Sequence, residues 1–358
     1  MPNKTLEKWE EKTLEDILDK GSSNLSANKL NTCEGDYPVY GASGLVKRVN
    51  FYQQEKEYLA IIKDGAGVGR VYHYEPKSSI LGTLQYLFPK ENVNIRFAYY
   101  YLQSLDFAKY YQGAAIPHIY YKDYKNEKLV LPPLPEQQRI VGILDEAFEN
   151  IEKAKQNTLQ NLSNVKELFE SYVEQIFHYD CENIVSVTFS QEFKIKSGDF
   201  LSAQNMNLNG GYNVYGGNGI NGKHDTYNYS GENIIIGRVG EKCGNIHYVN
   251  DDIWVTDNAF VLIDTEHGFD KRFLYYLLTK LNLRQYAAKS THPVISGKSL
   301  KDVKLRFPEN ISEQQKIVTQ LDELQEQTKK LEQIYEQKIK DLDELKQSIL
   351  QKAFNGEL

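Results

Sequence analysis

The sequence has few cysteines and no long apolar run, and both absences narrow what the chain can be. Its 358 residues include only 3 cysteines, Cys33, Cys181 and Cys243, which lie far apart, so neither a zinc site nor a disulfide framework is indicated. No run of about 18 apolar residues occurs, which argues against a membrane span. The polar start lacks the apolar centre of a signal peptide. A reducing, cytoplasmic location is therefore expected.

Recognisable catalytic motifs are also missing. The sequence contains no HExxH, no Gly-x-Ser-x-Gly and no cluster of histidine ligands. Gly297-Lys298-Ser299 resembles the end of a phosphate-binding loop, but His292 stands where that loop needs glycine. Residues 65–70 resemble a dinucleotide-binding fingerprint, but Arg70 replaces the last glycine. We therefore expect no catalysis, no metal site, and only hydrogen-bonded loop roles for His118 and His292.

The net charge of −7 at first argues against a nucleic-acid partner. However, residues 136–177 carry a net charge of −4 and residues 313–358 carry −3, which together account for the whole excess. The rest of the chain is neutral and can still gather lysine and arginine on one face. The charge therefore leaves DNA binding open for that part of the chain.

The chain repeats itself with a period of 175 to 177 residues. Four segments recur in the same order, which favours a duplicated domain over a solenoid, because a solenoid needs several short repeats. A duplicated chain can fold with an internal pseudo-twofold, as a homodimer does with two chains. The matching segments are 37–44 with 212–219, 65–71 with 240–246, 115–119 with 291–295, and 136–141 with 313–318.

The first part of each repeat is rich in Gly, Tyr, Asn and β-branched residues, which predicts strands joined by tight turns. A shorter helical stretch follows in each copy, near 97–112 and 271–289. We therefore predict that each is a compact mixed α/β (α+β) domain. The expected strands include 58–63, 80–89, 233–237 and 253–263.

The second part of each repeat predicts a long helix with an apolar seam. Pro135 suits the first turn of the first helix, and Ser312 with Gln315 suggests a capping box for the second. Apolar residues recur every three or four positions, as in a coiled coil, and each seam has one extra step of four, at Thr158–Leu162 and Tyr335–Ile339. The seams run through Ile140, Leu144, Ala147, Ile151, Ala154, Thr158, Leu162, Val165, Phe169, Tyr172 and Ile176, and through Ile317, Leu321, Leu324, Thr328, Leu331, Tyr335, Ile339, Leu342, Leu345 and Ile349.

Because the two helices match in length and irregularity, we expect them to pair as an antiparallel coiled coil that separates two recognition domains. Such an arrangement suits a ligand with two separated half-sites, of which duplex DNA is the commonest. The predicted boundaries are 1–131 for the first recognition domain, 132–178 for the central helical region, 179–308 for the second recognition domain and 309–358 for the C-terminal helical region.

Several of these segments resemble the specificity subunits of type I restriction–modification systems. The segment 131–140 is similar to the start of that family's central conserved helix, and 345–358 resembles its usual C-terminus. Looser similarity extends to 9–17, to the Tyr-Pro-Val-Tyr-Gly block and to 256–261. The loop at 113–119 departs from its counterpart, which puts a common role for the two loops in doubt.

The resemblance implies a non-catalytic DNA-binding subunit that reads a bipartite target, one target recognition domain for each half-site. Its implied partners are double-stranded DNA, two modification (methyltransferase) subunits that bind S-adenosylmethionine, and a restriction motor-nuclease subunit that uses ATP and Mg. No Asn-Pro-Pro-Tyr or Asp-Pro-Pro-Tyr loop occurs in this chain, so methyl transfer to adenine must come from a partner.

Candidate DNA contacts are polar and aromatic side chains near the glycine-rich turns. Arg and Lys can read guanine, Asn and Gln can read adenine, and Tyr can reach phosphate or base edges, although most of the 26 tyrosines would also suit a sheet or core. A scaffold with two protein- or carbohydrate-binding domains is the alternative, and the acidic net charge slightly favours it. The candidates for DNA binding are Tyr40, Lys47, Arg48, Lys63, Arg70, Tyr215, Asn218, Lys223, His224, Arg238 and Lys242, and those for the coiled-coil seam are Ile151, Leu162, Phe169, Leu331, Ile339 and Leu345.

Overall fold

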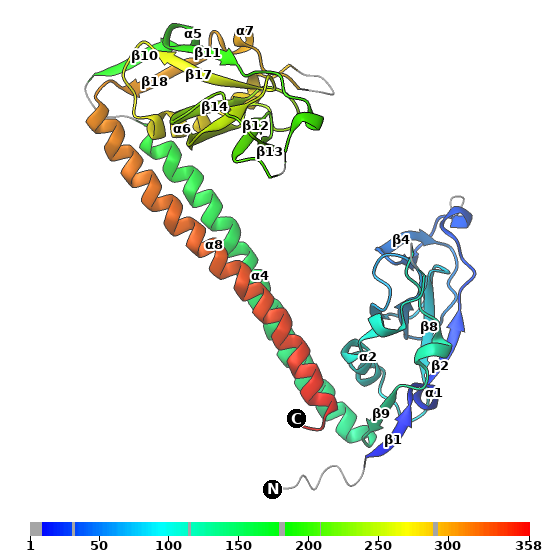
Figure 1. Ribbon diagram of the computed structural model, residues 1–358. Helices are drawn as coiled ribbons and strands as arrows, with labels where there is room; N and C mark the ends of the chain where they lie inside the picture. The colour runs from blue at the N-terminus through cyan, green and yellow to red at the C-terminus, as the bar shows by residue number, and fades with distance from the viewer. Residues whose placement is uncertain (1–8, 31–32, 114–115, 179–182, 208, 289–292) are drawn as a thin grey trace. The chain divides into compact units, whose positions relative to one another are not determined.

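The chain forms two compact units in a computed structural model described over residues 9–30, 33–113, 116–178, 183–207, 209–288 and 293–358 (Figure 1). Cys181 and His292 lie outside these ranges. The first unit joins residues 1–159 with 336–358, and the second comprises 160–335. No helix in the described part of the chain is long and apolar enough to cross a membrane.

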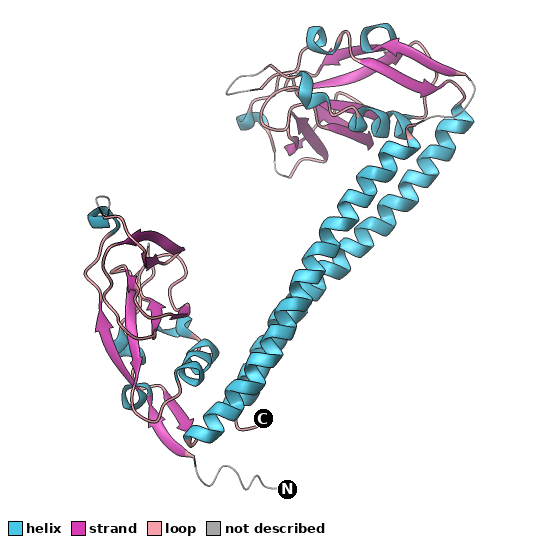
Figure 2. Cartoon of the chain, turned by 180° about the vertical axis from the view of Figure 1, so that it is seen from behind, coloured by secondary structure: helices cyan, strands magenta, loops and turns pink. Residues whose placement is uncertain are grey.

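The first unit is a mixed α/β domain whose strands form a four-stranded sheet (β2-β8-β5-β6), a three-stranded sheet (β4-β3-β7) and a β1–β9 ribbon (Figure 2). Its elements are β1 Glu10–Thr13, α1 Leu14–Ile17, β2 Leu18–Ser22, the 3₁₀ helix η2 Ala27–Leu30, β3 Tyr37–Gly41, β4 Gly44–Val49, β5 Tyr58–Ile62, β6 Val71–Tyr74, β7 Ser79–Ile80, β8 Leu84–Pro89, α2 Ile95–Ser104, η3 Phe107–Tyr110, α3 Tyr121–Tyr124 and β9 Lys128–Leu131.

The second unit repeats this topology strand for strand, with sheets β11-β17-β14-β15 and β13-β12-β16 and a β10–β18 ribbon. The predicted mixed α/β fold and its duplication are therefore confirmed. Its elements are β10 Ile184–Thr188, α5 Phe189–Glu192, β11 Phe193–Ser197, η4 Ala203–Asn205, β12 Tyr212–Gly216, β13 Gly219–His224, β14 Glu232–Gly237, β15 Ile246–Asn250, β16 Ile253–Val255, β17 Ala259–Thr265, α6 Lys271–Lys280, η5 Leu283–Tyr286, α7 Gly297–Leu300 and β18 Lys304–Pro308.

Two of the predicted strands are each broken in two. The expected strand 253–263 splits into β16 and β17, because Thr256–Asn258 turn and the two halves join different sheets. The expected strand 80–89 splits at Leu81–Thr83 in the same way. Apolar continuity along the chain does not reveal such a change of sheet.

The long helices are α4, Leu134–Ile176, and α8, Ile311–Phe354. Each unit holds the N-terminal part of one helix beside the C-terminal part of the other, so the predicted antiparallel pairing is confirmed. Within the first unit, Lys155 Nζ lies 2.6 Å from an Asp343 carboxylate oxygen. Pro135 does lie in the first turn of α4, but Ser312 is not the cap of α8. Its N–H donates to Asn310 Oδ1 at 2.8 Å, so the cap lies two residues earlier.

Burial along the helices agrees with most of the predicted seam. At three places the less exposed residue is the one after the predicted seam residue. Ile151 is buried, and Leu162, Phe169 and Ile339 are half-buried. Leu331 and Leu345 are wrong as seam residues, because they are 41% and 47% exposed, and Tyr172 is also exposed. At all three places the next residue is less exposed, namely Glu332, Lys346 and Val173. At these places the spacing between successive seam residues is four and then three, whereas the prediction had three and then four. The apolar stems of long polar side chains such as Glu332 and Lys346 can cover the seam.

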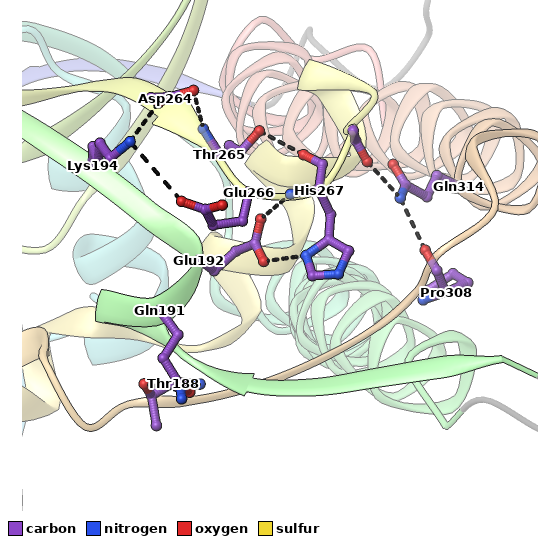
Figure 3. Close-up of polar contacts among 11 residues, drawn as sticks. Thr188, Gln191, Glu192, Lys194, Asp264, Thr265, Glu266, His267, Pro308 and Gln314 are labelled. Atoms are coloured by element: carbon purple, nitrogen blue, oxygen red, sulfur yellow. Dashed lines mark hydrogen bonds and ion pairs between the residues drawn. The ribbon is translucent and has the colours of Figure 1, made fainter.

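A buried glutamine ties each helix to the domain that precedes it, and we call this contact the helix joint. In the second unit, Gln314 is fully buried, and its Oε1 accepts the Asp270 N–H at 2.9 Å. Its Nε2 donates to the Pro308 carbonyl at 2.9 Å (Figure 3). In the first unit, Gln137 accepts the Asn94 N–H at 2.7 Å and donates to Pro132 at 2.8 Å. The glutamine thus satisfies backbone groups that would otherwise be buried without partners.

An arginine, a tyrosine and an aspartate reinforce each joint about two turns further along the helix. The Arg272 guanidinium contacts the Asp322 carboxylate at 2.8 Å, and the Tyr276 hydroxyl donates to the same group at 2.5 Å. In the first unit, Arg96 and Tyr100 contact Asp145 at 2.6 and 2.5 Å. Burial, followed by the hydrogen bond to the carboxylate, raises the pKa of Tyr100 to about 12, so this phenol stays a proton donor at neutral pH.

A buried carboxylate lies beside the joint of the second unit. Glu192 is buried, and its carboxylate accepts the His267 backbone N–H at 2.9 Å and contacts His267 Nδ1 at 2.7 Å (Figure 3). Ile17 occupies the corresponding place in the first unit, since each follows a capping-box threonine by four residues. The two joints therefore share their glutamine but differ in the residues that pack around it.

Candidate nucleic-acid interface

Each unit carries a hairpin whose tip is built from glycine. The β3–β4 hairpin turns at Gly44 with a φ of 102°, and the β12–β13 hairpin turns at Gly219 with a φ of 101°. Both hairpins also have a bulge, at Val39/Tyr40 and at Val214/Tyr215. Positive φ angles of this kind favour glycine, so the repeated Gly-x-x-Gly segment reflects a shared backbone path.

A second glycine-rich segment follows β5 in the first unit and β14 in the second. Gly65 and Gly69 have φ angles of 89° and 86°, and their counterparts Gly240 and Gly244 have 91° and 89°. The Gly65 N–H donates to the Pro117 carbonyl at 3.0 Å, and the Gly240 N–H donates to Pro293 at 3.1 Å. In both units this segment therefore lies against the Pro-containing loop that the sequence repeat had aligned.

Substitutions at two of these glycines are expected to differ in cost. An ideal Cβ at Gly69 would lie 2.7 Å from Phe107 Cβ, whereas one at Gly65 has no neighbour within 4 Å. Both alanine variants carry the strain of a positive φ, about 1–2 kcal/mol, and Gly69→Ala adds an overpacking cost of about 1–3 kcal/mol. Denaturant unfolding of the two full-length variants tests this. Equal destabilisation would show that Phe107 moves aside freely.

Three predicted residues of the first unit are already engaged within the protein. The Tyr40 ring stacks on Tyr74 with centroids 4.1 Å apart. Lys47 Nζ donates to the Leu30 carbonyl at 2.9 Å, and Arg48 donates to the Asp36 carbonyl at 2.7 Å. These contacts give Tyr40 a packing role and hold the two cations near the base of the hairpin rather than its tip.

Lys63 and Arg70 lie at the glycine-rich segment. The Lys63 N–H and carbonyl bond to Thr83 and Ile119, and its Nζ is 3.9 Å from the Asp64 carboxylate. Arg70 is exposed and lines a cleft of about 1010 Å³ whose opposite wall includes Asp343 of α8. Of the predicted cations in this unit, Arg70 is the one whose charged group has no hydrogen-bond or ion-pair partner among the described residues.

In the second unit the structure brings the hairpin tip and the β14–β15 segment together. An ideal Cβ at Gly217 would lie 2.3 Å from the Val239 carbonyl, and one at Gly240 would lie 3.6 Å from Asn218 Oδ1. Asn218 and Lys242 are both exposed here. Pro293 and Ile295 contact the same segment, because the Gly240 N–H donates to the Pro293 carbonyl and the Ile295 N–H donates to the Arg238 carbonyl.

Arg238 and Tyr215 are more buried than a base-reading role requires. The Arg238 guanidinium lies over the Phe260 ring, 5.1 Å from its centroid, and its Nε is buried without a partner. The Tyr215 ring lies 5.8 Å from the His247 ring, and burial raises the pKa of Tyr215. Both side chains therefore pack against neighbouring aromatic rings of their own unit.

Lys223 and His224 lie at the other end of the same hairpin. His224 pairs with Tyr212 in the β12–β13 register, and its ring stacks on Trp254 with centroids 4.8 Å apart. His224 Nδ1 accepts the Asp225 N–H at 2.7 Å, while Lys223 is exposed on the adjacent position. The structure therefore does not bring these two residues together with Asn218 and Lys242.

Exposed apolar residues beside the hairpin turns were missed by the sequence reasoning. Leu45 is 54% exposed and Ile220 is 58% exposed, and each directly follows the turn glycine of its hairpin. Apolar side chains can contact the thymine methyl group in the major groove. The sequence did contain a sign of these residues, because an aliphatic residue follows a polar, glycine-rich turn in both repeats.

Within the described residues, no three His, Cys, Asp or Glu side chains come together as metal ligands do. His118 Nδ1 lies 3.3 Å from the Ile116 carbonyl, as expected for a hydrogen-bonded loop histidine. The side chains at these turns are donors, acceptors and apolar groups. They suit binding to phosphates and base edges.

Comparison with known proteins gives a family and a fold. The family described as "Type I restriction modification DNA specificity domain" matches residues 6–161 and 182–341. The chain is 28% identical over 178 residues to the type I restriction enzyme EcoprrI specificity subunit of Escherichia coli, covering 48% of this chain and 44% of that protein. It is 29% identical over 114 residues to a putative type I restriction enzyme specificity subunit, S.HindORF215P, of Haemophilus influenzae, covering 31% and 30%. The matched regions thus span less than half the length of these two relatives.

Two solved structures share the fold. One chain, described in work on complex assembly and conformational transition of the type I R-M system, has a TM-score of 0.78 at 18% identity and is covered completely, as is this chain. The HsdS subunit from Thermoanaerobacter tengcongensis has a TM-score of 0.57 at 17% identity, with 100% of this chain and 99% of that chain covered.

Proposed function

Because the chain belongs to the type I restriction modification DNA specificity domain family, we propose that it reads a bipartite DNA target, with one recognition domain for each half-site. The observation that carries this proposal is the duplication of a complete domain, including the hairpin tip and the glycine-rich segment, at equivalent positions of two repeats. Duplicated recognition elements suit two half-sites at a set distance. This chain then supplies sequence recognition and no catalysis.

The proposed partners follow from that role. Two modification subunits would dock on the long helices and methylate adenine with S-adenosylmethionine, and a restriction subunit would supply ATP- and Mg-dependent cleavage. The exposed apolar residues of the helices, Leu331 and Leu345 among them, are available for such docking. Exposed apolar groups on a helix favour contact with another protein.

The direct test is genome-wide mapping of N6-methyladenine in the host, with the gene for this chain intact and deleted. We expect a split motif that is lost on deletion. If no motif is lost, the chain is to be co-expressed with a modification subunit of a type I system. A continued absence of any sequence-dependent methylation would contradict the proposal and favour a protein-binding scaffold.

Exchanging one recognition domain is expected to change one half of the motif only. Residues 1–131 would be replaced by the corresponding domain of a relative with a different target, while the second domain and both helices stay unchanged. Methylation mapping then reports the new motif. The matched exchange of residues 179–308 should alter the other half. A change in both halves after a single exchange would contradict the assignment of one domain to each half-site.

A further inference from the structure

One edge of the second unit gathers four cations that form no ion pair with a described acid. Lys298 lies on α7, Lys301 directly follows that helix, and Lys304 and Arg306 lie on β18. We call these four residues the basic edge. All four are exposed, and no described residue offers their charged nitrogens a hydrogen-bond or ion-pair partner. Lys304 and Arg306 project from the same side of their strand, because Leu305 and Phe307 between and beyond them are buried.

Two lysines of the basic edge have counterparts in the first unit, where acidic side chains balance their charge. Its Glu15 N–H donates to the Lys125 carbonyl at 2.9 Å, as the Ser190 N–H donates to Lys301 at 3.2 Å in the second unit. Glu15 therefore corresponds to Ser190, and Lys125 to Lys301. The ribbon register gives the rest, since Thr13 pairs with Lys128 as Thr188 pairs with Lys304.

In the first unit these lysines form ion pairs. Lys125 Nζ lies 2.9 Å from the Glu15 carboxylate, and Lys128 Nζ lies 2.7 Å from Glu11. The second unit keeps both lysines but has Ser190 and Ser186 in place of the two glutamates. It also adds a cation, because Arg306 pairs with Ser186 where Val130 pairs with Glu11.

The surroundings of the basic edge favour a polyanion over a protein surface. Ser186 and Ser190 are exposed beside it and can donate to phosphate oxygens. None of the exposed large apolar side chains of the described chain falls within 184–192 or 297–308. Asp302 in these segments and Glu309 directly after them are exposed. Glu192 and Asp264 of β17 are already in contact with His267 and Lys194.

We propose that the basic edge binds the phosphate backbone of duplex DNA outside the half-site that the second domain reads. This inference rests on the proposed function and adds an asymmetry to it: only the second recognition domain extends its contact into flanking DNA. The contact is to phosphates, so it is independent of sequence and depends steeply on salt.

The test restores the first unit's charge balance in the second. Ser186→Glu with Ser190→Glu places carboxylates at the positions from which Glu11 and Glu15 form ion pairs with Lys128 and Lys125 in the first unit. From there they can pair with Lys304 and Lys301. Both positions are exposed, so folding should be retained. The matched control, Glu11→Ser with Glu15→Ser, frees Lys128 and Lys125 in the first unit. The complex of each full-length chain with its modification subunits would be titrated with duplexes carrying the mapped motif and a long flank on one side or the other.

We expect the wild-type complex to bind more tightly when the flank lies on the second domain's side, and the glutamate variant to lose that preference. Each phosphate contact adds roughly 0.9 to the slope with which the logarithm of the binding constant falls against the logarithm of the salt concentration. With two such contacts, the binding constant of the wild type should fall about tenfold more than that of the variant between 50 and 200 mM salt. The Glu11/Glu15 variant should gain a similar dependence on the first domain's side.

Three other outcomes would contradict the basic edge as a DNA contact, the proposed function, or both. Motif-specific binding without any flank preference would overturn the basic edge as a DNA contact and leave the proposed function standing. Unchanged DNA binding, with loss of a restriction or modification subunit from the glutamate variant, would assign the edge to an acidic protein surface. No motif-specific binding by the wild-type complex would overturn both proposals.

Discussion

Replacing Gln314 by alanine is expected to destabilise the second unit by about 3–5 kcal/mol, because the change orphans several buried hydrogen-bonding groups and leaves a cavity. Gln314 is fully buried and contacts the backbone at Asp270, Pro308 and Gly268. These groups lie at the end of β18, before α6 and in the loop between β17 and α6. The substitution therefore loosens the attachment of the domain to its helix, and not only one local contact.

The same motif supplies the matched control. Gln315 is the next residue, it is exposed, and its replacement by alanine should change stability by no more than about 0.5 kcal/mol. Hydrogen exchange of the full-length chain resolves the two units, so protection of α6 and β18 can be compared between the variants. Gln137→Ala and Gln138→Ala repeat the comparison in the first unit. Equal loss of protection in the Gln314 and Gln315 variants would contradict the role of Gln314 in attaching the domain to its helix.

Lengthening both helices by one heptad is expected to lengthen the unspecified gap of the DNA motif by about three base pairs. Seven helical residues add about 10 Å, and each base pair of duplex takes roughly 3.4 Å. The insertions would follow Thr158 and Tyr335, where both seams have their extra step of four. The division between the two compact units falls one residue after the first insertion, at Leu159, and at the second insertion, after Tyr335. The insertions should therefore leave the contacts within each unit intact.

Methylation mapping reads this result directly, with loss of the original motif and appearance of the longer one. Inserting a heptad into α4 alone is the control, because it shifts one helix against the other and should abolish methylation of both motifs. If the doubly lengthened chain still methylates the original motif, the helices do not set the distance between the half-sites.

The duplicated α/β fold and the two helices could be predicted because they depend on periodic patterns and on a repeat within one sequence. The role of the Glu-Gln-Gln segment could not, although the segment was recognised. Its period marks a helix, but only the structure shows that Gln137 and Gln314 face the backbone of another element. The seam was misplaced at Leu331 and Leu345 for a related reason, since three-step and four-step alternatives lie on nearly the same helix face.

The candidate interface was harder to predict than the fold. Sequence reasoning places polar residues near turns but does not separate a side chain that reaches outward from one that supports the surface. Arg238 lies over Phe260 and Tyr40 stacks on Tyr74, so both serve packing. Leu45 and Ile220 were overlooked because an isolated aliphatic residue in a strand pattern ordinarily indicates core. The basic edge depends on the absence of two glutamates from the second repeat. That absence becomes visible only when the strand registers show which residues of the two repeats correspond.

The first unit is assembled from two separated stretches of chain, with the whole second unit between them. Residues 349–354 pack into the first domain's core, where Leu350 and Ala353 are fully buried and Phe354 contacts Phe97 and Tyr101. During synthesis on the ribosome, every segment of the second unit emerges before that last stretch does. A nascent chain that stops before Glu336 therefore holds all of the later unit but an unfilled core in the earlier one. The domain that is made first is therefore completed only when residues 336–358 have been translated.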